Sequence, residues 1–563
     1  LSFPFLSLRV RMKVIVLATL LCSVTGSLEI IFKRVESSIS CGVCELLVNI
    51  FYTAAKKNEP MSFVKLKFVP LCRVAQNSIV CNGIFDTFAP DILEAFQYVQ
   101  ISPTEICSML MEACPQMRIP EHEWTVNLTS VPKPRVQEKL RSKANNVIKI
   151  LQINDIHLDT DYAVGSTSNC QEPLCCRNLS TNKLLARNIP AERWGSAECD
   201  TPLKTLDYIL EVIAERHTDI SYIMWLGDIA PHDIWRQTKA GQLITLRDGI
   251  SALKRFFPNT PVLPTIGNHE TKPDGSYPPP WVTNPNFSIT WFSEALVELW
   301  KDWIPPSQLQ NVLTGGYYSI QPHPGLKVLS LNTLYCHCRN WWLYVNSTDP
   351  AQQLLWLVTE LQQAESTGQK VHIIGHIPPG NADCLKVWSR NYYEIVSRYE
   401  STITGQFFGH THLDEFEVFY DSQNLSRPVS VAYIAPSITP FEGGNPSYRI
   451  YTIDSDTWEV IDYESLIMDY KKANKYSESN PELFKLYSAK QAYALNNLGP
   501  KEWNKLIYRM KKEPLLFDKF YQNYYTNSPN RPSYGRQDKF RILCNLKSGK
   551  TKAAKKLCGD LKS

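Results

Sequence analysis

The chain has 563 residues, of which 44% are hydrophobic, 20% are charged and 11% are aromatic. These values exclude a disordered or low-complexity chain and leave enough apolar material for more than one domain. The net charge of +4 is unevenly distributed, because residues 464–563 contain 21 Lys and Arg against 9 Asp and Glu. We expect this basic end to meet an anionic surface, and an anionic membrane fits the charge as well as nucleic acid does. No basic motif interleaved with aromatic residues favours nucleic acid.

The beginning of the chain predicts secretion. Arg11-Met12-Lys13 is a basic start, Val14–Cys22 is a short apolar run, and Val24-Thr25-Gly26 is a small-residue exit. The run is too short to cross a bilayer, so residues 1–26 are interpreted as upstream residues and a cleaved signal peptide. We therefore expect a secreted or lysosomal protein, in an oxidising compartment that also explains the 16 cysteines.

Five sequons for N-glycosylation agree with a secretory route. Their asparagines are Asn127, Asn178, Asn286, Asn346 and Asn424.

Residues 37–118 form a separate cysteine-dense unit with apolar residues at helical spacing. Its cysteines are Cys41, Cys44, Cys72, Cys81, Cys107 and Cys114. A Cys-x2-Cys pair can be half of a zinc site, but four further cysteines in a secreted chain favour disulfides. The pattern resembles the saposin family of lipid-binding helical modules. The resemblance implies the pairs Cys41–Cys114, Cys44–Cys107 and Cys72–Cys81, and a lipid-interacting role; a purely structural cap is the alternative.

The rest of the chain divides into three segments. Residues 119–146 are rich in proline and polar residues, which predicts a linker. Residues 147–463 alternate short apolar strands with amphipathic helices, one beginning after Pro202 and another after Pro350 and ending before Gly368. This alternation predicts an α/β layered body rather than an all-β sandwich. Residues 464–563 are expected to form a basic, mainly helical C-terminal region.

Five apolar runs in this body end in residues that can bind metals. The runs are Val147–Ile153, Ile220–Leu226, Val262–Ile266, Val371–Ile374 and Ile403–Phe408. The residues that follow them are Asp155, His157, Asp228, Asn268, His376, His410 and His412. Open α/β sheets place their sites at the carboxyl ends of strands, so we expect these side chains to meet around two metal ions bridged by Asp228. Carboxylate, amide and imidazole ligands without thiolates suit zinc, manganese or iron.

The ordered set Asp-x-His, Gly-Asp, Gly-Asn-His-Glu, Gly-His and Gly-His-x-His resembles the calcineurin-like metallophosphoesterase superfamily. The resemblance implies a central β-sandwich flanked by helices and two metal sites that share Asp228. One site is implied to consist of Asp155, His157, Asp228 and His412, and the other of Asp228, Asn268, His376 and His410. With the strings Gly375-His-Ile-Pro-Pro-Gly380 and Phe407-Phe-Gly-His-Thr-His412 and the saposin-like unit ahead of them, the mature chain is similar to the acid sphingomyelinase family. This implies two Zn²⁺ ions and hydrolysis of sphingomyelin in membranes to ceramide and phosphocholine, and we infer no protein partner.

The chemistry of phosphodiester hydrolysis explains these residue types. A zinc-bound water has its pKa lowered to about 7, which supplies hydroxide as a nucleophile. Two ions about 3.5–4 Å apart hold this nucleophile and a phosphoryl oxygen. We therefore expect a hydroxide that bridges the two metals to attack phosphorus in line. The leaving alkoxide needs a proton, which a histidine outside the ligand set supplies. We assign His269 and His232 jointly to leaving-group protonation and phosphoryl stabilisation. For His232 a surface turn is the alternative, because Pro231 places it in a loop.

Two further residues stand near these motifs. His372, on the strand before Gly375, is expected to pack rather than to bind metal. Tyr448 matches a tyrosine beside the site in the sphingomyelinase pattern, which implies a contact with phosphate.

The remaining cysteines and one basic residue complete the comparison with that pattern. The resemblance suggests the pairs Cys170–Cys175, Cys176–Cys199, Cys336–Cys384 and Cys544–Cys558. Cys338 is then free or competes with Cys336 for Cys384. Arg339 stands where the mammalian-type pattern has an acidic residue, which changes the expected contacts on the substrate side.

Two other functions are the alternatives. A secreted nucleotide phosphodiesterase of the sphingomyelinase-like type shares the catalytic motifs but lacks the saposin-like unit. A lipid-presenting protein with an inactive body needs only the saposin-like unit, and the intact ligand set argues against it. Purple acid phosphatases are excluded, because Pro231 occupies the position of their iron-binding tyrosine.

Overall fold

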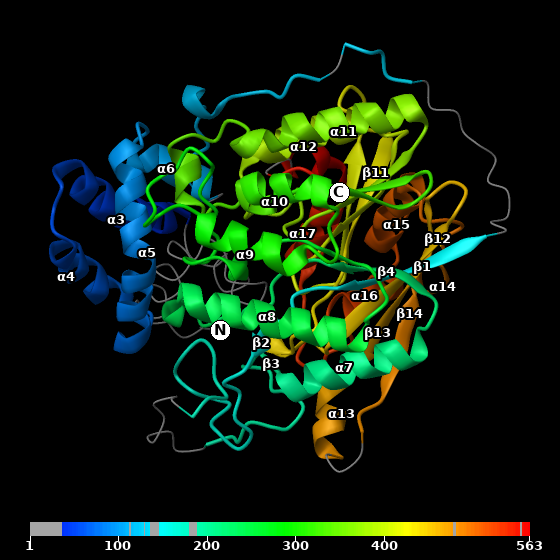
Figure 1. The fold of residues 1–563 in the computed structure, drawn as a ribbon, viewed down its shortest axis with the longest axis horizontal. Coiled ribbons are helices and arrows are strands. Elements are labelled where there is room, and N and C mark those ends of the chain that lie inside the picture. Colours follow the sequence, from blue (N-terminus) through cyan, green and yellow to red (C-terminus); the bar gives the residue numbers. More distant parts are fainter. Residues whose placement is uncertain are drawn as a thin grey trace, which may run out of the picture.

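The computed structural model describes residues 37–111, 114–128, 130–134, 146–178, 188–476, 480–551 and 554–562. The predicted signal peptide lies outside the described residues. Two six-stranded sheets form the centre of the molecule, helices flank them, and a separate group of N-terminal helices lies at one side (Figure 1). The α/β layered body with a central sandwich is therefore confirmed.

The first sheet combines the beginning and the end of the catalytic body. Its strands, in spatial order, are β14 (Leu483–Ser488), β13 (Val460–Met468), β12 (Ser447–Asp454), β1 (Val147–Ile153), β4 (Ile220–Trp225) and β5 (Val262–Pro264). Strands β1, β4 and β5 are parallel, so their carboxyl ends lie at the same edge. The C-terminal region is not separate from this sheet, because β13 runs across the boundary expected at residues 463–464 and β14 extends the sheet.

The second sheet carries the other two predicted site strands. Its order is β10 (Glu415–Tyr420), β11 (Pro428–Ile434), β9 (Ile403–Phe408), β8 (Lys370–Ile374), β7 (Leu326–Ser330) and β6 (Tyr318–His323). Strands β7, β8 and β9 are parallel. Apolar side chains from both sheets, including Tyr222 and Met224 from the first and Ile374 and Phe407 from the second, share one core. A short third pair, β2 (Leu158–Asp159) and β3 (Thr201–Pro202), follows the first site strand.

Helices of the body cover the sheets. They are α7 (Leu203–Arg216), α8 (Lys239–Phe256), α9 (Thr290–Trp300), α10 (Leu309–Gly315), α11 (Gln353–Thr367) and α12 (Lys386–Arg398). Helix α7 begins directly after Pro202 and buries Leu206, Ile209 and Ile213, which share one helical face. Helix α11 ends at Gly368, whose φ of 71° closes the helix in the left-handed conformation. Both predicted helices are confirmed.

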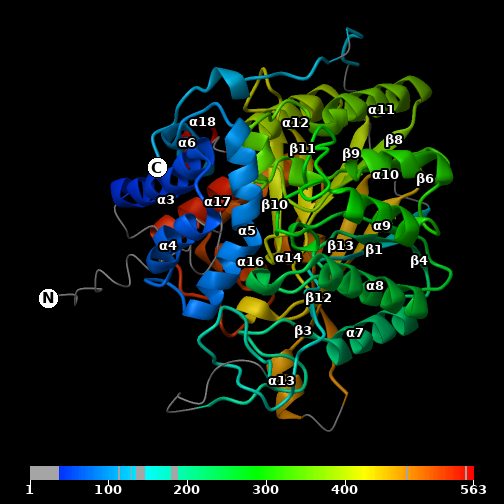
Figure 2. The same cartoon turned by 60° about the vertical axis from the view of Figure 1, so that its left-hand side comes forward.

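The N-terminal helices are α3 (Ser37–Lys57), α4 (Met61–Cys72), α5 (Ser78–Tyr98) and α6 (Pro103–Leu110). The three implied disulfides hold them, and Phe51, Phe68 and Phe85 pack in their centre. This core is continuous with Trp235 and Trp342 of the body. Figure 2 shows the helices against the side of the body, so the unit is docked rather than tethered at a distance.

The C-terminal region is mainly helical, as predicted. Its helices are α13 (Tyr470–Lys475), α14 (Ala489–Tyr493), α15 (Pro500–Lys512), α16 (Pro514–Tyr524), α17 (Arg536–Leu546) and α18 (Ala554–Leu557). Trp503, Leu506 and Ile507 of α15 join the core between the sheets and these helices. No helix in the described part of the chain is long and apolar enough to cross a membrane.

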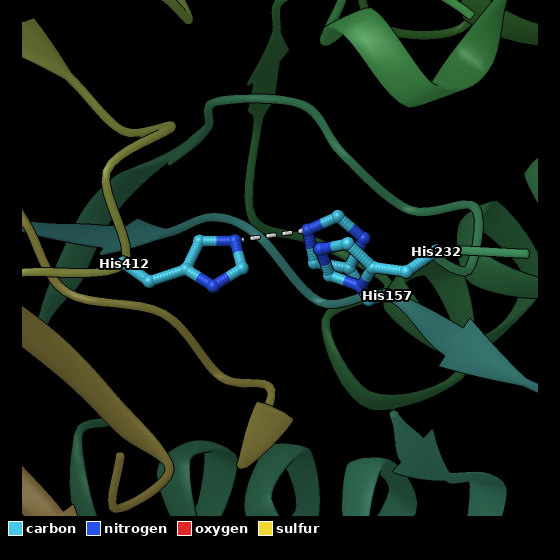
Figure 3. A group of neighbouring side chains, drawn as sticks. All are labelled: His157, His232 and His412. Atoms are coloured by element: carbon cyan, nitrogen blue, oxygen red, sulfur yellow. Dashed lines mark hydrogen bonds between the residues drawn. The ribbon is translucent and has the colours of Figure 1, made fainter. Parts of the chain in front are cut away.

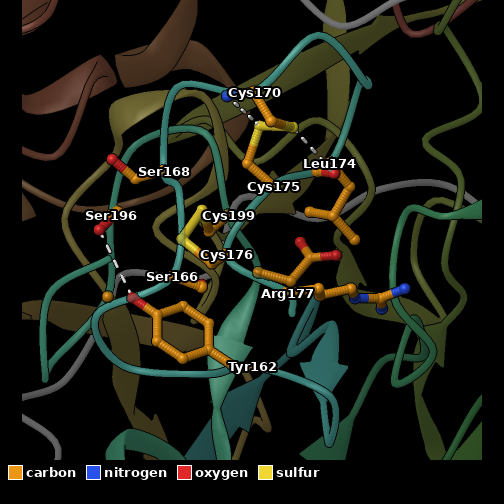
Figure 4. The surroundings of a disulfide bond; sticks show 12 residues. Tyr162, Ser166, Ser168, Cys170, Leu174, Cys175, Cys176, Arg177, Ser196 and Cys199 are labelled. Carbon is orange, nitrogen blue, oxygen red and sulfur yellow. Dashed lines mark hydrogen bonds between the residues drawn. A yellow bond between two sulfur atoms is a disulfide. The ribbon is translucent and has the colours of Figure 1, made fainter. Parts of the chain in front are cut away.

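The remaining implied disulfides are also present. Cys170–Cys175 and Cys176–Cys199 lie together in the loop that precedes α7 (Figure 4). Cys336 pairs with Cys384 and Cys544 with Cys558. Cys338 is disulfide-bonded as well, and Cys384 pairs with Cys336. A free thiol at Cys338 and its competition for Cys384 are therefore both wrong.

Candidate metal centre

All seven predicted ligands lie at the edge where strands from both sheets end. Asp155 and His157 follow β1, Asp228 follows β4, and Asn268 follows β5. The second sheet supplies the other three, because His376 follows β8 and His410 and His412 follow β9. Parallel strands bring their carboxyl ends together, and the two packed sheets then bring the two sets of loops face to face.

The Asp228 carboxylate lies between the two predicted sets of ligands. Its Oδ2 atom is 3.1 Å from His376 Nε2 and 3.6 Å from His157 Nε2. On one side His157 Nε2 is 3.1 Å from His412 Nε2, and His412 Nε2 is 3.7 Å from Asp155 Oδ1. Figure 3 shows these two rings pointing toward each other, with His232 over His157.

The second set of ligands meets on the other side of Asp228. His376 Nε2 is 3.0 Å from Asn268 Oδ1 and 3.2 Å from His410 Nδ1. The other nitrogen of each ring has a hydrogen-bond partner. His376 Nδ1 is 2.7 Å from the carbonyl oxygen of Leu226, and His410 Nε2 is 2.9 Å from Asp383 Oδ2. Such outer partners fix the direction in which a histidine offers its free nitrogen.

The backbone of this edge adopts a conformation that side chains usually avoid. Five of the seven ligands have positive φ angles: Asp155, His157, Asp228, His410 and His412. Non-glycine residues with positive φ are uncommon, and clusters of them occur at functional sites where the surrounding structure holds the strain. The unusual backbone conformation therefore occurs at residues that the sequence motifs also single out.

The donor set fits divalent cations. Asp155 and Asp228 are almost completely buried, and burial raises the pKa of Asp155 to about 6 and that of Asp228 to about 7. The Nδ1 atom of His412 is buried without a hydrogen-bond partner among the described residues. Buried carboxylates and converging imidazoles need compensating positive charge, which a bound cation supplies. Three clusters from this set and its neighbours have the spacing of metal ligands.

His232 lies beside the first set of ligands and is held by Asp200. Its Nδ1 atom is 2.7 Å from Asp200 Oδ1, its backbone N–H donates to Asp200 Oδ2 at 2.7 Å, and its ring stacks on His157. Burial alone lowers the pKa of His232, but the charge and hydrogen bond of Asp200 outweigh burial, so the pKa is raised. The alternative of a surface turn is wrong, since the side chain is only 13% exposed.

His269 faces the same space from the β5 loop. Its ring centroid is 4.8 Å from that of His157 and 4.7 Å from that of His232. Burial, followed by the charges of His232 and Arg339, holds the pKa of His269 well below its ordinary range. The two candidate histidines thus lie together but differ in their preferred protonation state.

The acidic residues behind these histidines and loops were not predicted from the sequence. Asp200 and Asp383 lie in loops without a recognisable spacing, so no sequence signal identified them. Glu270 was visible in the Gly-Asn-His-Glu motif, but its role was not. Its carboxylate accepts hydrogen bonds from the backbone of Gly267, Asp228 and Ile229, which ties the β4 and β5 loops together.

The two other singled-out residues have hydrogen-bond partners outside the ligand set. His372 is buried between Tyr222 and the carbonyl of Trp458, which confirms the packing role. Tyr448 is only 1% exposed, and its hydroxyl is 3.1 Å from His217 Nε2 at the end of α7. The structure therefore gives the Tyr448 hydroxyl a histidine partner, and its contact with phosphate stays a prediction.

Comparison with known proteins places this site in a family. Residues 148–414 match the calcineurin-like phosphoesterase model, and residues 427–547 match the acid sphingomyelin phosphodiesterase C-terminal region. The sphingomyelin phosphodiesterase of Bos taurus is 40% identical over 516 residues, covering 90% of this chain and 81% of that protein. This chain belongs to the sphingomyelin phosphodiesterase family. It is an enzyme with a metallophosphoesterase catalytic domain, and the family implies divalent metal ions.

Other relatives differ in the share of this chain that they match. Sphingomyelin phosphodiesterase 1 of Caenorhabditis elegans is 34% identical, covering 90% of this chain and 91% of that protein. A protein of Mus musculus named cyclic GMP-AMP phosphodiesterase SMPDL3A is 30% identical, covering 72% of this chain and 90% of that protein. The longer matches therefore belong to the sphingomyelin phosphodiesterases.

Proposed function

We propose that this protein hydrolyses sphingomyelin to ceramide and phosphocholine with two bound zinc ions. The observation that carries the proposal is the position of Asp228 Oδ2 between His376 and His157, within 3.6 Å of both. In this proposal Asp155, His157, Asp228 and His412 hold one ion, and Asp228, Asn268, His376 and His410 hold the other. The match of 90% of the chain to sphingomyelin phosphodiesterases supports this substrate over a nucleotide.

The side chains around the ions have separate proposed roles in the reaction. When bound, the ions supply Lewis acidity and lower the pKa of a water molecule. His232 is the better proton donor for the departing ceramide oxygen, because Asp200 favours its protonated form. His269 lies across the same space and is assigned to the phosphoryl oxygens. Glu270 keeps the two loops that carry Asp228 and His269 in register.

A direct comparison of substrates tests this function. The purified protein is given sphingomyelin, phosphatidylcholine and ATP side by side at acidic and neutral pH. Fastest hydrolysis of sphingomyelin supports the proposal. Preference for ATP would instead support the nucleotide phosphodiesterase, and hydrolysis of none of them by zinc-loaded protein would support the lipid-presenting alternative.

Burial of two ligand histidines predicts that they keep their metal in mild acid. The pKa values of His157 and His412 are held well below the ordinary value, first by burial and then by neighbouring histidines. A histidine binds metal only when neutral, so these two remain competent below the unperturbed pKa of about 6.5. We expect bound metal, measured by mass spectrometry against pH, to persist as the pH falls through 6.5, because these two imidazoles do not take up protons there. Half-loss of metal near pH 6.5 would contradict this.

We also propose that the N-terminal helices are a saposin-like module that docks on the membrane. Helix α4 presents Met61, Phe63 and Leu66 to solvent, and Leu66 is 76% exposed. Lys65 and Lys67 lie beside them, so apolar insertion and attraction to anionic headgroups act at the same place. The basic C-terminal region adds to this attraction. The exposure of all five sequon asparagines supports a glycosylated protein that is secreted or lysosomal.

A point substitution tests membrane docking better than removal of the module. Deletion would expose Trp235 and Trp342, which pack against its core. We expect Leu66→Glu to lower hydrolysis of liposomal sphingomyelin about 10- to 100-fold, because burying a leucine is worth about 1.5–3 kcal/mol. A water-soluble phosphodiester should be hydrolysed at the normal rate.

Leu355→Glu is the matched control, because Leu355 is 43% exposed on α11. Helix α11 lies away from α4 in both views (Figures 1 and 2). Equal activity of Leu66→Glu and Leu355→Glu on liposomes would favour the structural-cap alternative.

A further inference from the structure

A buried pair of opposite charges, Asp274 and Arg339, lies behind the metal centre and has no part in the mechanism above. Asp274 is completely buried and Arg339 is 6% exposed. The Nη1 atom of Arg339 is 2.8 Å from Asp274 Oδ1, and the backbone N–H of Asp274 donates to Gln237 Oε1 at 3.0 Å. Arg339, whose basic character departs from the expected pattern, therefore has a carboxylate partner.

The other oxygen of Asp274 faces two residues of the site. Asp274 Oδ2 accepts a hydrogen bond from Asn268 Nδ2 at 3.4 Å and lies 3.2 Å from His269 Nδ1. Because the Asn268 amide nitrogen is turned toward Asp274, its Oδ1 atom is turned toward His376 Nε2, 3.0 Å away. One carboxylate thus contacts both a metal-ligand amide and the adjacent histidine.

The Nδ1 atom of His269 is buried close to Asp274, but the two are not aligned for a hydrogen bond. This nitrogen has no aligned hydrogen-bond partner among the described residues, although Asp274 Oδ2 is within reach. Hydrogen bonds at catalytic groups are often misaligned without substrate and tighten in the complex. His232 shows the aligned form of the same arrangement, with Asp200 Oδ1 2.7 Å from its Nδ1.

The surrounding backbone keeps Asp274 and Arg339 in place. Gly275 has a φ of 75°, and a Cβ atom added there would lie 2.5 Å from His337 Nδ1. The loop of Asp274 therefore packs directly on the segment that carries Arg339. The Cys336–Cys384 disulfide anchors that segment beside the loop of Asp383, the partner of His410.

We propose that Asp274, held by Arg339, is a positioning residue for the Asn268–His269 pair. It directs Asn268 Oδ1 to the metal and, by engaging Nδ1 of His269, orients the ring so that its protonated form offers Nε2–H to the phosphodiester. The inference rests on the proposed metallophosphodiesterase function. An ion pair that only stabilises the fold would affect activity independently of His269.

A double-mutant cycle on the metal-loaded enzyme tests this role. Asp274→Asn is made in the wild type and in His269→Ala, and kcat per bound metal is measured with a water-soluble phosphodiester. We expect a loss of about 10- to 100-fold in the wild type, the usual cost of losing an outer partner, and at most about threefold in His269→Ala. Metal affinity should also fall about tenfold through Asn268.

Arg339 provides the second arm of the test, which also serves if Asp274→Asn does not fold. Arg339→Met should lower kcat in the same direction and depend on His269 in the same way, whereas Arg339→Lys should recover part of the loss. Equal losses in the two His269 backgrounds, or full activity of both Asp274→Asn and Arg339→Met, would overturn the role of Asp274. Full activity after metal removal would instead refute the proposed function itself.

Discussion

Replacement of Asp228 by asparagine is expected to weaken both metal sites and to lower kcat roughly 1000-fold or more. Asp228 Oδ2 is 3.1 Å from His376 Nε2 and 3.6 Å from His157 Nε2, so it is close to both sets of ligands. Metal ions contribute several kcal/mol to stabilising the transition state, and each 1.4 kcal/mol is a factor of ten in rate. Metal content per chain and kcat on the same preparation measure both consequences.

The loop around Asp228 should keep its structure in Asp228→Asn. Asp228 Oδ1 accepts from the backbone N–H of His269 at 2.8 Å, and the asparagine carbonyl can accept the same bond. His157→Ala is the matched comparison, since it removes a ligand from one set only and should leave about one ion bound. Two ions retained in Asp228→Asn, or equal metal loss in both variants, would show that Asp228 does not bridge.

Removal of His232 is expected to lower hydrolysis of sphingomyelin by roughly 100- to 10,000-fold, the usual contribution of a general acid. Asp200 favours the protonated ring, so His232 is prepared to give a proton to the ceramide oxygen. His232→Ala should keep its metal, because His232 is not one of the seven proposed ligands. A substrate with a nitrophenolate leaving group needs little protonation and should lose much less activity.

His269→Ala is the comparison for this experiment. The loss of activity in this variant should be similar on natural and activated substrates. A group that contacts the phosphoryl oxygens contributes to the rate whichever group leaves. The reverse result, with His269 sensitive to the leaving group and His232 insensitive, would exchange the two roles. Metal content of both variants separates these effects from simple loss of zinc.

Local sequence patterns were enough to predict the composition of the site and the outline of the fold. Ligands such as Asp155 and His410 follow apolar strands within four residues, so local spacing identified them before their partners were known. Helix α7 was equally local, since Pro202 and the apolar face at Leu206 and Ile209 need no distant contact. The disulfide pairs came instead from the resemblance to known families, because spacing alone permits many pairings.

The side chains that support the ligands could not be predicted before the fold was known. Asp200 lies 32 residues before His232, and Asp383 lies 27 residues before His410, with no repeating pattern to connect them. The sequence showed Arg339 only as a departure from the sphingomyelinase pattern, whereas the fold places it against Asp274. A ligand at a strand end is fixed by local periodicity, whereas a supporting carboxylate is fixed by where two loops meet in space. That meeting depends on the packing of the two sheets, which no short stretch of sequence encodes.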